Sequence, residues 1–246
     1  MNNSGNIVKS NKEFWLVDQI IYSHVSEAEY INGFNRLFND WKMESGGYLS
    51  ILMEEKYEDV MLNNGLRKIS NTVEYTRTLD VLADTDSKFY PHALSEPLLS
   101  DDAFARLYEQ CRSGSFNQNI PQSIETVMDS LKRELGVNWR NHCFYFAYEG
   151  EIVGLAIPHL EKGTSGEGRL FYFGLVPKWR GKGIGASIHN HALKLMKGLN
   201  AQTYVGSTDV NNQYMIKIFE KNGCTLRNVK GIYRFDCASN QCRKDD

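Results

Sequence analysis

The 246-residue sequence predicts an α/β fold in which helices flank a mixed, mostly antiparallel sheet. Two observations lead to this class. First, the apolar runs Cys143–Tyr148 and Glu151–Leu160 are joined at Glu149–Gly150, a join typical of a β-hairpin. Second, strand-like and helical patterns then alternate in the order strand, helix, strand, helix, strand. A hairpin followed by such alternation favours a sheet with both antiparallel and parallel neighbours.

Helical spacing of large apolar residues defines the first element of the N-terminal region. One stripe on a helix expected over Glu27–Met43 is formed by Tyr30, Phe34, Leu37, Phe38 and Trp41. Three shorter elements follow: a strand at Tyr48–Met53, a helix at Lys56–Asn64 that stops at Gly65, and an alternating strand at Val73–Leu79. Residues 1–12 are polar and expected to be disordered, and Asp84–Pro97, with two prolines, is expected to be a linker.

The C-terminal region holds the other elements. Helices are expected at Asp101–Arg112 and Ile124–Leu135, before the hairpin. A glycine-rich loop at residues 160–168 follows the hairpin. The elements expected after it are a buried strand at Arg169–Val176, a helix at Gly183–Lys197, a strand at Gln202–Ser207, a helix at Asn212–Asn222 ended by Gly223, and a strand at Ile232–Phe235.

These elements divide the chain into an accessory region, residues 1–95, and a main domain, residues 96–246. The two parts share an echo: Asn64–Gly65 precedes Tyr75 by ten residues, and Asn222–Gly223 precedes Tyr233 by ten. Two explanations stay open. The echo is chance, because helix–glycine–strand joins are common, or residues 14–80 are a reduced copy of the main domain.

Composition excludes several classes of protein. A formal net charge of -2 argues against a broad nucleic-acid surface, which is usually basic. No apolar run approaches the roughly 20 residues that a membrane span needs, and the polar N-terminal stretch lacks the apolar core of a signal peptide. The five cysteines are irregularly spaced, so reduced thiols in a cytoplasm are the simplest interpretation, and no metal site is expected.

The sharpest motif lies at residues 174–187, Gly-Leu-Val-Pro-Lys-Trp-Arg-Gly-Lys-Gly-Ile-Gly-Ala-Ser. A buried strand ends at Val176, because Pro177 has no N–H to continue the ladder. Glycines at every second position from Gly181 let successive backbone N–H groups converge on one point. The helix that follows adds its unpaired N–H groups and the positive end of its dipole. Such a nest binds a phosphate or pyrophosphate, with Arg180 and Lys182 adding positive charge.

The spacing of this segment differs from that of two other phosphate-binding loops. A Walker A loop needs G-x-x-x-x-G-K-[ST], and the sequence has no such string. A dinucleotide fingerprint needs G-x-G-x-x-G with an acid about 20 residues on. Here the spacing is G-x-G-x-G, and although Asp209 follows the next strand, too little chain follows Gly185 for the further βαβ units of that fold.

At these residues the sequence resembles the GCN5-related N-acetyltransferases. Their loop motif is [QR]-x-x-G-x-[GA], and Arg180-Gly-Lys-Gly-Ile-Gly185 matches it at each defined position. A second family motif matches at Asn212 and Gly223, while Phe219 replaces a frequent Tyr and Cys224 a frequent Phe. The resemblance covers roughly residues 97–236.

The resemblance implies acetyl-CoA as co-substrate and the following site. The backbone of Leu175 and Val176 pairs with the pantetheine arm, and the Asn212 side chain contacts the pantetheine region. The N–H of Val176 could stabilise the carbonyl oxygen. The pyrophosphate is held by the N–H groups of Gly181, Lys182, Gly183, Ile184, Gly185 and Ala186. No side chain is assigned as general acid or base, since Phe219 has no hydroxyl.

The predicted function is therefore an acetyl-CoA-dependent N-acetyltransferase in which an amine attacks the thioester directly. The acceptor is a small-molecule amine, a protein terminus or a lysine, and a homodimer is one arrangement left open. Two alternatives stay open: a non-catalytic CoA-binding sensor, which Phe219 in place of Tyr allows, and a Rossmann-type nucleotide-binding module.

For several other polar residues, the sequence favours a structural role over a role in the site. His189 and His191 lie two apart on a helix, so they point to different faces and cannot chelate one metal. Thr208 and Asp209, at the end of the strand before Asn212, could reach the centre of the site, and a helix cap is the favoured interpretation. Three residues precede or enter the first core strand: His142, Cys143 and Tyr145. Any one of them could face the acceptor pocket, and the sequence does not indicate which.

Overall fold

The computed structural model describes residues 5–10, 14–19, 26–44, 47–116 and 122–237. The chain forms two compact units, one made of residues 1–73 and 228–246 and the other of residues 74–227. Strands β4 (Arg67–Thr78) and β10 (Thr225–Asp236) each contribute residues to both units. The boundary therefore differs from the one expected at residue 95, because these two long strands pass from one unit into the other.

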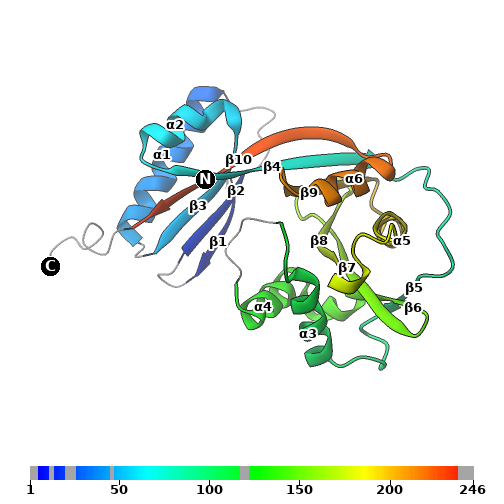
Figure 1. The fold of residues 1–246 in the computed structure, drawn as a ribbon. Helices are drawn as coiled ribbons and strands as arrows, with labels where there is room; N and C mark the ends of the chain where they lie inside the picture. Colours follow the sequence, from blue (N-terminus) through cyan, green and yellow to red (C-terminus); the bar gives the residue numbers. More distant parts are fainter. Residues whose placement is uncertain (1–4, 11–13, 20–25, 45–46, 117–121, 238–246) are drawn as a thin grey trace. The chain divides into compact units, whose positions relative to one another are not determined.

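The larger unit, residues 74–227, is a sheet with helices on both faces (Figure 1). Its strands β5 to β9 stand in the order β9-β8-β7-β6-β5. Pairing is antiparallel from β5 to β8 and parallel between β8 and β9. The strands are β5 (Tyr90–Ala93), β6 (Phe144–Tyr148), β7 (Glu151–Leu160), β8 (Glu167–Leu175) and β9 (Thr203–Asp209). The mixed, mostly antiparallel sheet is confirmed.

Strand β7 shows why two layers of helices are needed. Leu155 and Ile157 belong to an apolar cluster with α3 (Asp101–Arg112) and α4 (Ile124–Leu135). Ala156, between them, belongs to a second cluster with α5 (Gly185–Gly198). Successive side chains of a strand point to opposite faces, so α3 and α4 cover one face of the sheet and α5 covers the other.

The predicted hairpin and helices are confirmed. Glu149 and Gly150 both have positive φ between β6 and β7, as a tight hairpin turn requires. Helices α3 and α4 have the predicted bounds, and Ser100 and Ser123 cap their N-termini. The last helix, α6 (Gln213–Lys221), precedes Gly223 as expected.

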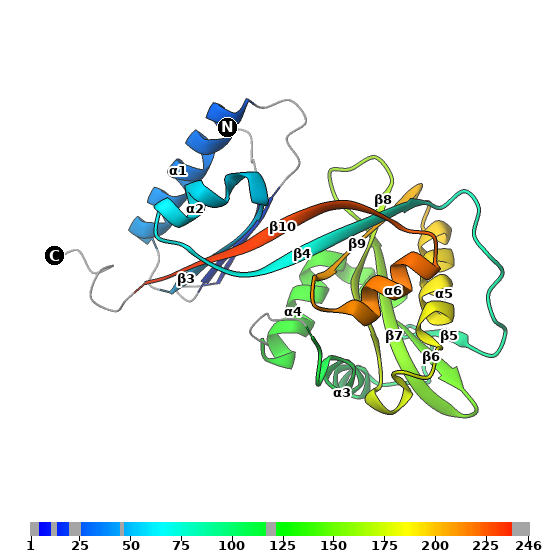
Figure 2. The ribbon, with the colours of Figure 1, turned by 45° about the horizontal axis from the view of Figure 1, so that its top comes forward.

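The smaller unit, residues 1–73 and 228–246, contains strands of the ten-stranded sheet that the described residues form (Figure 2) and has its own apolar core. Strands β1 (Gly5–Ser10), β2 (Phe14–Gln19) and β3 (Tyr48–Glu54) are followed by β10 in the strand order. Helix α1 (Glu27–Glu44) lies in this unit, with a 3₁₀ turn at Glu55–Tyr57 and α2 (Glu58–Asn63). The predicted stripe is confirmed: Phe34, Phe38 and Trp41 are buried in the core.

Three expectations need correction. The stretch Asp84–Pro97 is no simple linker, because β5 lies within it and pairs with β6. Residues 5–10 form β1, whereas the rest of the expected disordered stretch lies outside the described residues. Cys111, Cys143 and Cys224 are free and buried, but Cys237 is disulfide-bonded, so the expectation of reduced thiols fails there.

No helix in the described part of the chain has the length and apolar character to cross a membrane.

Candidate functional site

The candidate site is a cleft that opens where β8 and β9 stop pairing. The two parallel strands are in register only at Glu167 with Thr203 and Gly168 with Tyr204. Beyond these pairs they diverge, and residues of both strands line a cavity of about 710 Å³. A register shift against β7 leaves Phe171 without a partner, because Ile157 pairs with Tyr172 and Pro158 with Leu170. Such a bulge bends the strand locally and redirects its side chains.

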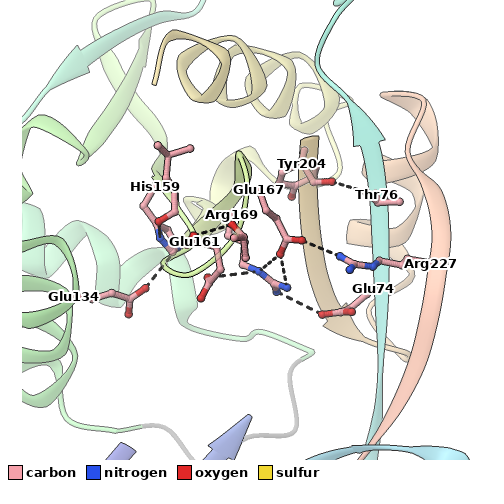
Figure 3. Close-up of polar contacts among 11 residues, drawn as sticks. Glu74, Thr76, Glu134, His159, Glu161, Glu167, Arg169, Tyr204 and Arg227 are labelled. Atoms are coloured by element: carbon pink, nitrogen blue, oxygen red, sulfur yellow. Dashed lines mark hydrogen bonds and ion pairs between the residues drawn. The ribbon is translucent and has the colours of Figure 1, made fainter. Parts of the chain in front are cut away.

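The closed end of the cleft is fixed by a charged cluster (Figure 3). Arg169 of β8 contacts carboxylate oxygens of Glu74, Glu161 and Glu167, and Arg227 pairs with Glu167 at 3.0 Å. Burial opposes the charge on Arg169, but the carboxylates outweigh it and raise its pKa. The cluster joins β8 to Glu74 of β4 and Arg227 of β10, across β9, at the end where β8 and β9 still pair.

The open end carries the predicted glycine loop. Gly181 and Gly183 have φ of 72° and 79°, and a Cβ on either would meet nothing within 4 Å. Glycine is needed there for its backbone conformation and not for lack of space. Gly185 has a different reason, because a Cβ there would lie 2.7 Å from Ile218 Cδ1, where α5 packs on α6. The loop thus presents its backbone at the N-terminus of α5, the arrangement that favours an anion.

Arg180 holds this loop in place through backbone oxygens. Its Nε donates to Leu175 O at 3.1 Å, while Nη1 and Nη2 donate to Ser113 O and Cys111 O, both at 2.8 Å. These carbonyls lie at the end of β8 and the C-terminal end of α3. Arg180 therefore satisfies carbonyls that a helix end leaves open, in addition to placing its charge beside the cavity.

The positive charges at the cavity differ from the sequence prediction. Lys182 lies over the Trp179 ring, with Nζ 4.4 Å from its centroid, and is absent from the cavity lining. Lys217 and Lys221 of α6 line the cavity, although sequence reasoning did not select them. Their spacing of four residues places both on one face of the helix, which was the available signal.

The backbone of β8 offers donors one residue away from the predicted one. The Val176 N–H donates to Val153 O of β7 at 3.0 Å, so its expected role towards a carbonyl oxygen does not fit this geometry. Bonding directions alternate along an antiparallel strand. The N–H groups of Phe173 and Leu175 therefore point away from β7, towards the space from which β9 has diverged.

Asn212 is the N-cap of α6. Its Oδ1 accepts from the Met215 N–H at 3.3 Å, and its Nδ2 donates to Thr208 Oγ1 at 2.9 Å. The cap was expected at Thr208 or Asp209, and this expectation is wrong: Asp209 instead accepts from the Asn211 N–H in a turn before the helix. Asn212 also lines the cavity, so capping fixes its position there.

The floor of the cleft is aromatic. Phe219 is 1% exposed and stacks on Tyr75 with centroids 5.2 Å apart. Tyr204 and Phe219 both line the cavity, and His189 lies against each ring. Burial lowers the pKa of His189 to about 3, so the ring is neutral. His191 bonds Asp86 O instead, which confirms that the two histidines point different ways.

The remaining candidates lie elsewhere. His142, Cys143 and Tyr145 do not line the cavity; Cys143 and Tyr145 are buried in the cluster with α3 and α4. At the rim, the rings of Phe116 and Tyr214 are exposed and their centroids lie 5.6 Å apart. The sequence did not indicate this pair. Within the described residues, no group of three His, Cys, Asp or Glu side chains could hold a metal ion.

A glycine loop at a helix N-terminus, beside a cleft between parallel strands that stop pairing, is an arrangement suited to an anionic group such as a phosphate. The profile described as the Acetyltransferase (GNAT) family matches residues 103–224. The chain belongs to this family of acetyltransferases.

Individual relatives are distant. N-alpha-acetyltransferase 30 of Schizosaccharomyces pombe is 26% identical over 99 residues, which cover 39% of this chain and 65% of that protein. A GCN5-related N-acetyltransferase from Sphaerobacter thermophilus has a TM-score of 0.67 at 13% identity, over 95% of this chain and 76% of its own. A tandem GNAT protein from the clavulanic acid biosynthesis pathway has a TM-score of 0.59 at 9% identity, over 96% of this chain and 79% of its own. At these identities the solved structures support the fold.

Proposed function

We propose that the protein transfers an acetyl group from acetyl-CoA to an amine. The observation that carries this proposal is the cleft between β8 and β9, open at the end where Gly181–Ala186 presents its backbone. The loop takes the pyrophosphate, with Lys217 and Lys221 beside it. The cleft takes the pantetheine arm, whose amides can pair with Leu175 as an added strand would.

The reaction needs alignment more than specialised side chains. The amine nitrogen attacks the thioester carbon; a C–N bond forms, the C–S bond breaks, and the electron pair stays on sulfur. The nitrogen loses a proton, and water can take it. Holding amine and thioester together supplies several kcal/mol of the barrier reduction. The N–H groups of Phe173 and Leu175 face the cleft; with Leu175 paired to the pantetheine arm, the Phe173 N–H is the available donor for the carbonyl oxygen.

The chemical class of the acceptor amine follows from two further observations. The name of the S. pombe relative points to the α-amino group of a protein chain as one acceptor class. The exposed pair Phe116 and Tyr214 at the rim offers apolar surface beside which a peptide could lie. A peptide α-amine is therefore the first class to test, with small-molecule amines and lysine as the others.

We also propose a cytoplasmic protein, which the three free and buried cysteines support and the disulfide at Cys237 does not. The rival function is a CoA-binding sensor without turnover, which Phe219 in place of a tyrosine favours. We also propose that the protein forms a homodimer, although the acceptor site does not require a second copy of the chain.

Two measurements test the proposal. A thermal-shift screen should show stabilisation by CoA and acetyl-CoA of about 2.7 kcal/mol at 100 times the dissociation constant. NAD and ATP should have far weaker effects, and the reverse order would contradict the proposal. Release of free thiol from acetyl-CoA is then followed with peptide, amino-sugar and polyamine acceptors. CoA binding without turnover on any of them would favour the sensor.

A further inference from the structure

Two buried side chains, His189 and Tyr204, and the half-buried Asn222 form a chain of hydrogen bonds beneath the cleft. Asn222 Nδ2 lies 3.0 Å from His189 Nδ1, and His189 Nε2 lies 3.0 Å from the Tyr204 hydroxyl. His189 and Tyr204 are 0% and 1% exposed. Tyr204 is the member of the chain that lines the cavity.

The direction of each hydrogen bond follows from the first one. Asn222 Nδ2 also lies 3.0 Å from Ala186 O, and a carbonyl oxygen can only accept, so this end of the amide is the NH₂ group. It must then donate to His189 Nδ1 as well. A neutral imidazole that accepts at Nδ1 carries its proton on Nε2, so His189 donates to the Tyr204 oxygen. The Tyr204 proton is therefore free to point elsewhere, and the cavity is the space that the ring adjoins.

Gly206 shows where that hydroxyl stands. It lies two residues from Tyr204 on β9, hence on the same face of the strand. A Cβ on Gly206 would lie 2.7 Å from both Tyr204 Cζ and Phe219 Cε1, and closest of all to the Tyr204 hydroxyl oxygen. The hydroxyl therefore stands beside the outer edge of the Phe219 ring, the edge at which a tyrosine in place of Phe219 would carry its own hydroxyl.

We infer that the Tyr204 hydroxyl donates a hydrogen bond to the sulfur of CoA as it leaves, oriented by His189 and Asn222. This inference rests on the proposed function. As the C–S bond breaks, negative charge develops on sulfur, and a donor already in place stabilises it. The thiolate takes its final proton from water on release, and the proton lost by the amine balances it. Phe219 then serves as the apolar wall beside the sulfur.

The surroundings suit a donor that keeps its proton. Burial raises the pKa of Tyr204 well above its usual value, so the hydroxyl stays protonated through the working pH range. The charged or titratable groups that act on the pair are Cys224 and Arg169 for Tyr204 and Arg77 for His189. Arg77 and burial both disfavour protonated His189, which preserves the direction of the chain.

The first test compares two buried tyrosines that flank the same ring. Tyr204→Phe removes the proposed donor, while Tyr75→Phe removes a hydroxyl from the ring stacked on Phe219, outside the cavity lining. On any amine that wild type acetylates, Tyr204→Phe should lower kcat by about 10²-fold, with KM for acetyl-CoA unchanged. Tyr75→Phe should leave kcat unchanged. Equal effects of both variants on kcat would overturn the inference.

The second test needs no acceptor. The ultraviolet absorbance of the thiolate reports the pKa of the thiol in bound CoA, with desulfo-CoA as the reference for the protein's own cysteines. A donor to the thiolate lowers this pKa, so Tyr204→Phe should raise it by about one to two pH units. If Tyr204→Phe unfolds the chain, His189→Leu replaces it, and the thiol pKa should then lie between those of wild-type-bound and free CoA.

The outcomes separate the two proposals. CoA that binds wild type with an unshifted thiol pKa, or a pKa that the variant leaves unchanged, overturns the role of Tyr204 and leaves acetyl transfer intact. Failure of wild type to bind CoA overturns the proposed function, and the Tyr204 inference with it.

Discussion

The first half of the chain follows the same order of elements as the second, yet the cleft described above lies in the second half. β1, β2, α1, β3, α2 and β4 correspond in order to β7, β8, α5, β9, α6 and β10. In each series the first two strands pair antiparallel and the second and third pair parallel. The strand next to the third one comes from the opposite half: β10 beside β3, and β4 beside β9.

The difference lies at the parallel pair. β2 and β3 stay in register over four residues, from Phe14 with Tyr48 to Val17 with Ile51. β8 and β9 pair at two residues and then diverge. Trp15, Val17, Leu49 and Ile51 are buried, so apolar side chains fill the first half where the second half has its cavity.

The connection after the second strand differs as well. In the first half it is Ile-Ile-Tyr-Ser-His-Val, residues 20–25, which lie outside the described residues and contain no glycine. In the second half it contains Gly181 and Gly183 of the nest, and the third glycine, Gly185, begins α5. We propose that the first half is a reduced copy of the second without a CoA site, which requires one CoA per chain in a calorimetric titration. A site needs both strand divergence and a glycine nest.

Acid should separate the two units most strongly. Burial lowers the pKa of His189 to about 3 and that of His159 to about 4, although Glu134 lies 3.6 Å from His159. Since these folded values lie below the usual value of about 6.5, the unfolded chain binds more protons between them, and stability falls as pH drops below about 6.5. At pH 4.5 each histidine should cost the larger unit about 2–3 kcal/mol.

Hydrogen exchange measures this unit by unit. Of the six histidines, only His24 lies outside residues 74–227. Amides of β6 and β7 should lose protection on acidification faster than those of β3, and His189→Leu should reduce the difference. Equal loss in both units would mean that the buried histidines do not set the acid response.

Gly183→Asp should cause the largest loss of binding. The Asp carboxylate would face the pyrophosphate, and such like-charge contacts cost several kcal/mol, or at least about 100-fold in CoA affinity. Gly163→Asp is the matched control, since Gly163 has a similar φ of 80° and open space, in a turn far from the loop in sequence. Calorimetry of CoA binding to both variants, with circular dichroism to check folding, decides. Normal CoA affinity in Gly183→Asp would remove the loop from the site.

Arg180 tests whether the loop needs charge or architecture. Arg180→Lys keeps the charge but not the fork that reaches three carbonyls. We expect Arg180→Lys and Arg180→Gln to lose about 2 kcal/mol of stability and about tenfold in CoA affinity, because the backbone oxygens of Leu175, Ser113 and Cys111 each lose the Arg180 donor. Lys182→Gln should change both little. If Arg180→Lys behaves as wild type while Lys182→Gln does not, charge is the decisive property.

The sequence predicted the loop because two of its glycines, Gly181 and Gly183, have positive φ, a conformation that glycine adopts readily. It also predicted the hairpin and helices α3, α4 and α6, whose apolar spacing and caps are local. It could not predict that Arg180 would reach α3, or that the Val176 N–H would be used by β7, because both depend on strand register. The chain from Asn222 to Tyr204 joins three elements, and no local pattern relates them.

The smallest effects concern the two glycines that end α2 and α6. Gly65 N donates to Leu62 O and Gly223 N to Glu220 O, each at 2.9 Å, and both glycines have positive φ. The next residue in each case, Leu66 or Cys224, donates to the carbonyl one residue earlier in the helix, Met61 O or Phe219 O, so the two helices share one C-terminal motif. Alanine at either position should cost about 1–2 kcal/mol of stability, since its Cβ disfavours positive φ.

Gly65→Ala and Gly223→Ala should differ in their cost to stability and in their effect on CoA binding. A Cβ on Gly65 would lie 3.3 Å from Phe235 Cε2, and one on Gly223 3.5 Å from Arg77 Nη1, so Gly65→Ala should cost slightly more. Gly33→Ala, in the middle of α1 with open space around it, should instead stabilise by about 1 kcal/mol.

Gly223→Ala disturbs the end of α6, which lines the cavity, and should weaken CoA binding modestly. Gly65→Ala should leave it unchanged, because the first half contributes no CoA site. Urea unfolding and calorimetry on the three variants test this, and equal weakening of CoA binding by Gly65→Ala and Gly223→Ala would show that the first half shares in the site.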